Sequence, residues 1–290
     1  MKNRMFCETI QRLQEKVKNA IGYKIAFGAT LAVVMLNGLV NAQSRSTITT
    51  PAETPQHAPM RLHGFVPGGV ETNNWAGYAV TGNGFTDVRG SWHVPEVNCN
   101  VTPNSESAFW AGIDGYSDNT VEQTGTSSNC NGSTPQYFAW YEFYPAGPVT
   151  LTNFPVKPGD VIGAEVKYLG GETFQIRIHN HRTNQLYVKN HNVSGADRTS
   201  AEWIAEAPST GSSCEDILPL ADFHVANYGL DYTSDSGTNT AIDSGTSGRI
   251  RAFGSNVQEI TMVSCSGATE AVPTSLTSDG TSFRVWWKSE

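Results

Sequence analysis

Two carboxyl groups share one stretch that otherwise looks like part of a protein core. In "SAEWIAEAP" (residues 200–208), a β-strand would place Glu202 and Glu206 on one face, on either side of Ile204, with Trp203 on the other face. At ~3.3 Å per residue the two carboxyl groups lie about 13 Å apart along the strand, so each needs its own partner. A carboxyl group of this kind can remove a proton and later return it.

A third acid lies among aromatic residues. In "QYFAWYEFYP" (residues 136–145), strand geometry places Trp140, Glu142 and Tyr144 on one face, with apolar side chains on both faces. A bare buried carboxylate costs several kcal/mol, so Glu142 must be hydrogen-bonded, protonated or open to a cleft. A core strand with one satisfied acid and a strand lining a cleft both fit this pattern.

An amide side chain completes the set of candidate groups. In "NTVEQTGT" (residues 119–126), Gln123 lies beside a glycine and threonines. A neutral amide is a poor base, but its NH₂ group is a good donor to a developing oxyanion. Gln123 and a carboxyl group could therefore divide the work of hydrolysing an amide bond.

Strands must position these groups. From about residue 71 onward, short runs alternate apolar and polar residues and are separated by Gly, Asn, Asp or Pro, and no helical stripe of useful length follows residue 42. Gly170-Gly171 joins two of these runs and predicts a hairpin. We therefore expect an all-β chain folded as one antiparallel β-sandwich.

The N-terminal part precedes this domain. In residues 1–42, basic residues are followed by an apolar stretch and a small residue at a cleavage point, which predicts a secretory signal, with an uncleaved membrane anchor as the alternative. Residues 43–70 are rich in Pro, Ser, Thr and Gly and predict a linker or short pro-segment. Residues 71–290 form the expected β-sandwich domain, which would be secreted and free of the membrane once the signal is removed.

Net charge argues against one class of partner, and the cysteine content indicates disulfides. Without residues 1–42 the chain keeps 13 basic and 25 acidic residues, a net charge of −12, which argues against nucleic acid. Four cysteines remain in an exported chain and predict two disulfides with three possible pairings. These cysteines are Cys99, Cys130, Cys214 and Cys265. No Cys-x-x-Cys spacing occurs, and we expect no metal and no cofactor.

Five motifs in order resemble the glutamic peptidases, also called eqolisins. They are "NWAGY" (74–78), "FWAGIDG" (109–115), "EQTG" (122–125), "WYEFYP" (140–145) and "AEWIAEAP" (201–208). The resemblance runs from about Asn73 to the C-terminus and is far more specific than any single short pattern. It implies two long curved sheets in a lectin-like jelly roll, and a pepstatin-insensitive endopeptidase that acts on polypeptides in acid. We expect a monomer.

The resemblance also assigns roles to residues. The family's catalytic glutamine matches Gln123 and its catalytic glutamate matches Glu206, with Glu202 as the rival assignment. Positions around the family's cleft match a further set: Trp110, Asp114, Trp140, Glu142, Tyr144 and Glu202. The chain departs from fungal members at Ser127, where they carry Asp, and at Ala207-Pro208, where they carry acids. These departures affect the expected subsites and pH optimum more than the reaction.

One alternative belongs to a different class of protein. A secreted β-sandwich with aromatic residues on a concave face is also how carbohydrate-binding modules and lectins are built. Trp75, Trp110, Trp140 and Tyr144 could stack on sugar rings. The pairing of Gln123 with a carboxyl group favours amide hydrolysis, because sugar binding does not need that pair. An inactive homologue that serves as a binding protein is the remaining alternative.

Overall fold

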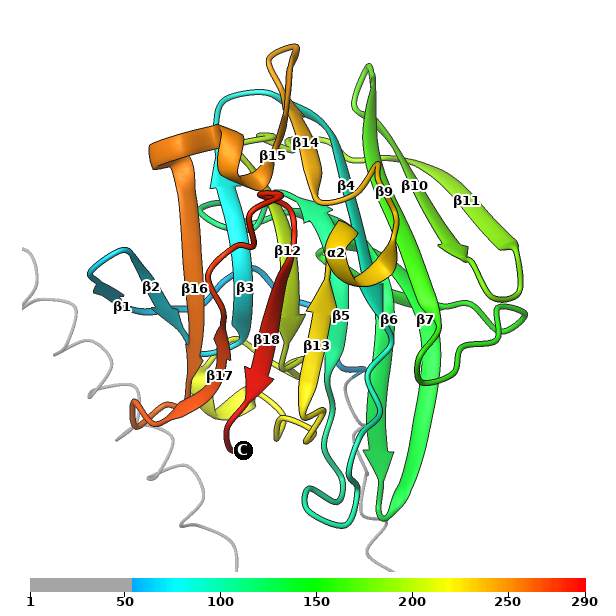
Figure 1. The fold of residues 1–290 in the computed structure, drawn as a ribbon, viewed down its shortest axis with the longest axis vertical. Coiled ribbons are helices and arrows are strands. Elements are labelled where there is room, and N and C mark those ends of the chain that lie inside the picture. Colours follow the sequence, from blue (N-terminus) through cyan, green and yellow to red (C-terminus); the bar gives the residue numbers. More distant parts are fainter. Residues whose placement is uncertain (1–53) are drawn as a thin grey trace, which may run out of the picture. The chain divides into compact units, whose positions relative to one another are not determined.

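The strands of this protein form one continuous hydrogen-bonded sheet that folds over into two layers (Figure 1). The structure is a computed structural model that describes residues 54–290. The expected secretory signal (residues 1–42) and the first part of the expected linker (residues 43–70) lie outside the described residues. Within residues 54–290, no helix has both the length and the apolar character needed to span a bilayer.

The first layer carries all the motifs singled out above. Its strands are, in spatial order, β8 (Ala146–Thr150), β7 (Thr134–Tyr144), β6 (Val121–Asn131), β5 (Ala108–Ile113), β12 (Ser200–Glu206), β3 (Trp75–Thr81), β16 (Val257–Val263), β2 (Gly69–Thr72) and β1 (Leu62–Val66). All neighbours are antiparallel except β16 and β2, which are parallel. Strand β12 is central, because it pairs with β3 on one side and β5 on the other.

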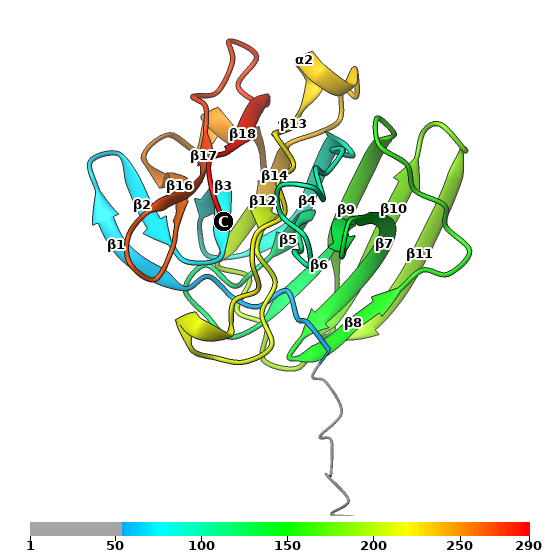
Figure 2. The same ribbon diagram turned by 90° about the horizontal axis from the view of Figure 1, so that it is seen from below.

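The second layer packs against the first. Its strands are, in spatial order, β17 (Thr269–Pro273), β18 (Phe283–Trp287), β13 (Val225–Tyr228), β4 (Phe85–His93), β9 (Val161–Gly170), β10 (Thr173–Asn180) and β11 (Gln185–Asn192). The hairpin of β14 (Thr240–Asp243) and β15 (Thr246–Arg249) extends from β4. Pairing between β16 and β17 joins the two layers, and Figure 2 shows the layers edge-on. The expected antiparallel sandwich is therefore confirmed.

Alternation along the strands separates two apolar clusters. Trp203 and Ala205 of β12 belong to the large core between the layers, whereas Ile204 belongs to a smaller cluster on the other face of the first layer. Trp110 and Trp140 lie in that smaller cluster. The predicted division of each strand into two faces is confirmed, and the faces with the candidate groups are buried as well.

Turns and short helices complete the described fold. The expected hairpin at Gly170-Gly171 joins β9 and β10, and both glycines have positive φ angles, of 93° and 58°, which glycine adopts without steric cost. The helices described are short: η1 (Cys214–Asp216), α2 (Leu230–Thr233) and η2 (Ile250–Asn256). None of them contributes to the arrangement described below as the candidate site.

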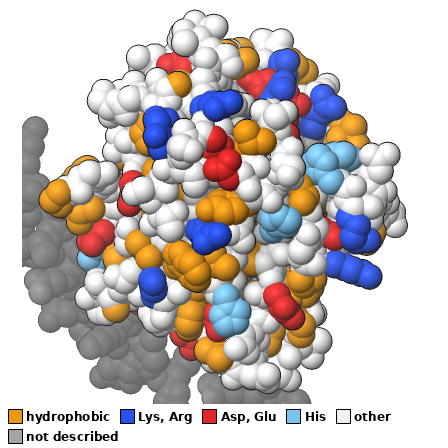
Figure 3. Space-filling model, in the orientation of Figure 1, with side chains coloured by type: hydrophobic (Ala, Val, Ile, Leu, Met, Phe, Trp, Pro, Cys, Tyr) orange, Lys and Arg blue, Asp and Glu red, His pale blue; other side chains and the backbone are white. Residues whose placement is uncertain are grey.

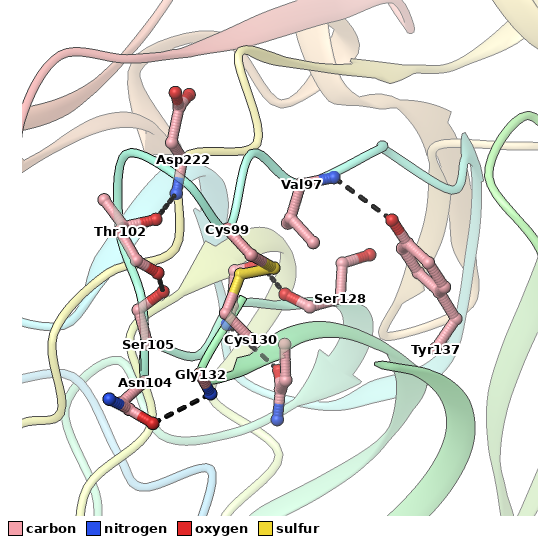
Figure 4. Close-up of a disulfide and its surroundings, with 12 residues drawn as sticks. Val97, Cys99, Thr102, Asn104, Ser105, Ser128, Cys130, Gly132, Tyr137 and Asp222 are labelled. Carbon is pink, nitrogen blue, oxygen red and sulfur yellow. Dashed lines mark hydrogen bonds between the residues drawn. A yellow bond between two sulfur atoms is a disulfide. The ribbon is translucent and has the colours of Figure 1, made fainter. Parts of the chain in front are cut away.

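Two disulfides link parts of the chain that are 31 and 51 residues apart in the sequence. Cys99 pairs with Cys130 and Cys214 with Cys265, which selects one of the three possible pairings. Around the first bridge, the Tyr137 hydroxyl accepts a hydrogen bond from the Val97 amide, so strand β7 holds the loop that carries Cys99 (Figure 4). In the face drawn in Figure 3, lysines and arginines are scattered among acidic residues.

Candidate active site

Strand register brings Gln123 and Glu142 together. Gln123 in β6 lies directly opposite Glu142 in β7, and on its other side it lies opposite Gly112 in β5. Gln123 Nε2 donates a hydrogen bond to Glu142 Oε2 at 3.2 Å, and both side chains are fully buried. Burial raises the pKa of Glu142 well above its usual range. The amide is therefore oriented by a neighbouring carboxyl group on the adjacent strand.

Two glycines leave room for indole rings above the sheet. A Cβ atom on Gly112 would lie 3.0 Å from the Trp110 ring and 3.1 Å from Gln123 Cβ, so the Trp110 indole lies over Gly112. A Cβ atom on Gly125 would lie 2.6 Å from Trp110 Cβ and 3.0 Å from the Trp140 ring. Larger residues at these two positions would displace both rings, because real Cβ atoms do not approach so closely.

Glu206 joins the group of Gln123 and Glu142 from the end of β12. The indole Nε1 of Trp110 donates a hydrogen bond to Glu206 Oε2 at 2.7 Å. Burial raises the pKa of Glu206, the nearby charge of Glu142 raises it further, and the Trp110 hydrogen bond and the charge of Arg61 lower it. Glu206 is therefore a buried acid with one strong donor.

Glu202 lies on the same strand but in a different environment. It lies opposite Gly112, in the same cross-strand row as Gln123, yet the Trp110 indole lies over that glycine and keeps the two side chains apart. Both carboxyl oxygens of Glu202 lack a hydrogen-bond partner among the described residues. Burial raises its pKa well above the usual range, and neighbouring acids raise it further.

Those neighbouring acids form a second carboxyl cluster (Asp114, Asp118, Glu122 and Glu202). The charges of Asp114 and Asp118 raise the pKa of both glutamates. Asp114 accepts hydrogen bonds from two backbone N–H groups, at 2.8 and 2.7 Å, yet burial and Asp118 raise its pKa to about 7. Of the sequence-predicted site residues, Asp114 and Glu202 therefore lie together here, outside the group around Gln123.

The N-terminal segment supplies a residue that the sequence analysis missed. His57 accepts a hydrogen bond from Gln123 Nε2 at its carbonyl oxygen (2.5 Å) and donates one from its backbone N–H to Glu142 Oε2 (3.0 Å). Its ring stacks on Trp140 at 3.6 Å between ring centroids, and its Nδ1 lies 3.5 Å from Glu206 Oε2. No local pattern in residues 43–70 indicates this contact, because it depends on pairing across long stretches of the chain.

The remaining predicted residues lie on the same face of the first layer. Trp110 and Trp140 are fully buried in the smaller apolar cluster, and the partly buried Tyr144 packs against that cluster. Met60 of the N-terminal segment packs there too. The face therefore combines an amide donor, two buried acids and flat apolar surfaces, and it holds an extended piece of polypeptide.

Residues 73–274 match the model of the peptidase A4 family. The chain belongs to this family. That range contains every residue predicted from the sequence for the site. It leaves out the segment that carries His57.

Two characterised proteins are similar to this member of the peptidase A4 family. Scytalidopepsin B of Scytalidium lignicola is 30% identical over 207 residues, which covers 68% of this chain and 76% of that protein. Aspergillopepsin-2 of Aspergillus niger is 28% identical over 179 residues, which covers 54% of this chain and 62% of that protein. The second match thus spans less than two thirds of the relative's own length.

Solved structures support the fold. Scytalido-glutamic peptidase, crystallised with a transition state analog inhibitor, has a TM-score of 0.61 at 21% identity and covers 74% of this chain and 98% of its own. Aspergilloglutamic peptidase from Aspergillus niger has a TM-score of 0.51 at 22% identity and covers 63% and 99%. The β-sandwich of the peptidase A4 family is therefore shared.

Proposed function

We propose that this protein is an acid endopeptidase in which Glu206 is the general base and acid and Gln123 stabilises the oxyanion. One observation carries the proposal. The Gln123 amide donates a hydrogen bond to a peptide carbonyl, that of His57, while Glu206 lies beside the same residue. An amide donor on a carbonyl oxygen with a carboxyl group alongside is the arrangement that peptide hydrolysis requires.

The reaction needs only groups that this chain supplies, together with water. Glu206, as a carboxylate, removes a proton from a water molecule, and the water oxygen forms a bond to the scissile carbonyl carbon. The negative charge that develops on the carbonyl oxygen accepts hydrogen bonds from Gln123 Nε2. Glu206 then gives the proton to the leaving nitrogen as the C–N bond breaks.

Neighbouring groups prepare the pair for acid conditions. Glu142 accepts one N–H of the Gln123 amide and so points that amide at the carbonyl. The Trp110 hydrogen bond favours the ionised form of Glu206 and opposes the effect of its burial on the pKa. A single carboxyl group that cycles between base and acid works best near its own pKa, so the acid activity that we expect depends on the groups that oppose the effect of burial, the Trp110 hydrogen bond among them. We expect pepstatin insensitivity because the proposed pair does not contain two aspartates.

Export is part of the same proposal. The apolar stretch within residues 1–42 would direct the chain out of the cytoplasm, and the two disulfides fit an oxidising compartment. The expected partners are therefore extracellular polypeptides, cleaved by a monomer.

The test is digestion of a denatured protein substrate from pH 2 to 8 with pepstatin present. We expect Gln123→Ala to lower kcat on the order of 10²- to 10³-fold, as the loss of one oxyanion donor does. Glu206→Gln should abolish activity because glutamine cannot exchange the proton. Glu202→Gln is the matched control, since it makes the same change on the same face of the same strand.

The outcomes separate the assignments. Activity that survives in Glu202→Gln and disappears in Glu206→Gln supports the proposed pair. The reverse pattern would assign the catalytic role to Glu202, four residues earlier in β12. If the unaltered chain is folded and inactive at every pH, the peptidase function is wrong, and glycan binding becomes the function to test.

A further inference from the structure

Residues 54–61 run along the face of the first layer that carries the candidate site. In Figure 2 this blue segment crosses from beside β8 to β1. Gln56 pairs with Ser209 in antiparallel fashion: the Gln56 amide donates to the Ser209 carbonyl (2.8 Å) and the Ser209 amide donates to the Gln56 carbonyl (3.0 Å). The Met60 amide donates to the Gly115 carbonyl at 2.8 Å. The segment is therefore held by its backbone, as an added strand would be.

The centre of the segment is fixed by side chains of the domain. The Ala58 carbonyl accepts hydrogen bonds from Trp75 Nε1 (3.1 Å) and Asn74 Nδ2 (3.3 Å). Asn74 Oδ1 in turn accepts the Arg61 amide at 2.8 Å. Both Asn74 and Trp75 are fully buried, so the domain uses residues of its interior to bind these backbone groups. Such buried polar groups need the partners that the segment supplies.

Arg61 anchors the end of the segment. Its guanidinium donates to Ser209 Oγ at 2.7 Å and to the backbone carbonyls of Gly211 and Ser213. Three acceptors from one loop match the fixed fork of N–H donors on an arginine, which a lysine could not reproduce. Arg61 therefore fastens the segment to the loop that follows β12.

His57 occupies the site itself. Gln123 and Glu142 bind the carbonyl and the amide of His57, and the imidazole lies between the Trp140 ring and Glu206. With the segment in place, His57 is 5% exposed, Gln123 is fully buried and Glu206 is 1% exposed. Both halves of the proposed catalytic pair are thus engaged by one residue of the chain's own N-terminal segment.

We propose that residues 54–61 are an autoinhibitory segment, with His57 as the residue that blocks the catalytic pair. The inhibition rests on the proposed peptidase function, whereas the occupation of the cleft does not. A polypeptide substrate needs the same Gln123 amide and the same space beside Glu206, so it can bind only after the segment has left. The fraction of molecules in the open form then sets the observed rate.

The first arm of the test measures occupation without using activity. The full chain is treated with diethylpyrocarbonate at pH 6.5, and modification of each histidine is followed by peptide mass spectrometry. His63 is the internal control because it lies just beyond the segment and is exposed. We expect His57 to react on the order of tenfold more slowly than His63, and Arg61→Ala to remove most of that protection. Equal rates for His57 and His63 in the unaltered chain would overturn the proposal.

The second arm measures inhibition. The initial rate of hydrolysis is compared for the unaltered chain, His57→Ala, Arg61→Ala and the control His63→Ala, with intact mass used to verify that the segment is still attached. We expect both segment variants to start on the order of tenfold faster, and His63→Ala to match the unaltered chain. An active unaltered chain that neither variant accelerates would overturn the proposal. If every chain is inactive while His57 stays protected, occupation of the cleft is upheld and the peptidase function is refuted.

Discussion

The second carboxyl cluster should make the fold less stable as the pH rises. The perturbation is Glu202→Gln, which keeps the size and polarity of the side chain but removes its ionisation. Both oxygens of Glu202 lack partners among the described residues, and burial raises its pKa well above the usual range of a glutamate. Above about pH 4.5 the folded chain still holds a proton that the unfolded chain has lost. The free energy of unfolding therefore falls with pH by about 1.4 kcal/mol per pH unit for each such group, until the pKa of the folded state is reached.

That slope fixes the size of the expected effect. At pH 4 the unaltered chain and Glu202→Gln should differ little, because the carboxyl group is neutral in the folded state and mostly neutral in the unfolded state. The effect then grows by about 1.4 kcal/mol for each further pH unit, until the pKa of the folded state is reached. At pH 7 the variant should therefore be more stable than its parent, by about 1.4 kcal/mol for each pH unit that separates 4.5 from the raised pKa of the folded state.

Guanidinium unfolding followed by circular dichroism between pH 4 and 8 measures this difference. The experiment is done in the Gln123→Ala background, so that unfolded chains are not digested. Glu96→Gln is the matched control, because Glu96 is exposed. Parallel stability curves for Glu202→Gln and its parent, or an equal gain from Glu96→Gln, would refute the argument from burial.

Two further predictions concern the site around Glu206. Trp110→Phe removes the donor to Glu206, so the pKa of Glu206 should rise and the acid limb of the pH–rate profile should move up by about one unit, since a hydrogen bond to a charged group is worth roughly 1.5–3 kcal/mol. An unmoved limb would contradict this. Burial lowers the pKa of His57 to about 3, so His57 is the main group of the segment that takes up a proton when the segment leaves at pH 3 to 4.5. After acidification, the delay before full activity is the time that the segment takes to leave, and it should shorten by up to about tenfold per pH unit between 4.5 and 3. The variant His57→Gln should show no such dependence on pH. The same dependence in that variant would exclude His57 as the cause.

Most of the fold follows from local patterns. The two-residue alternation in β7 and β12 predicts which side chains share a face, because the pleat allows no other arrangement. It predicts that Glu142 lies on the side of Trp140 and that Glu202 and Glu206 lie on the side of Ile204, and the structure places both Trp140 and Ile204 in the smaller cluster. A glycine pair after a strand predicts the β9–β10 hairpin for an equally local reason.

The separation of Glu202 from Gln123 does not follow from alternation. In register the two lie in one row with Gly112 between them, and the Trp110 indole covers that glycine, which depends on how side chains pack across three strands. The same limit applies to His57, since its segment reaches the site through contacts with residues far away in the sequence. Disulfide pairing is a third case, because spacing alone permits three solutions.

The Cys214–Cys265 disulfide holds the loop that binds Arg61. The loop that receives Arg61 ends at Ser213, directly before Cys214, and the bridge ties it to the turn between β16 and β17. A tethered loop loses less freedom when it closes around a ligand. The receptor for the chain's own N-terminal segment is thus completed by oxidation. A chain that is exported as we propose would therefore gain a firm binding loop for its inhibitory segment only after its thiols have paired.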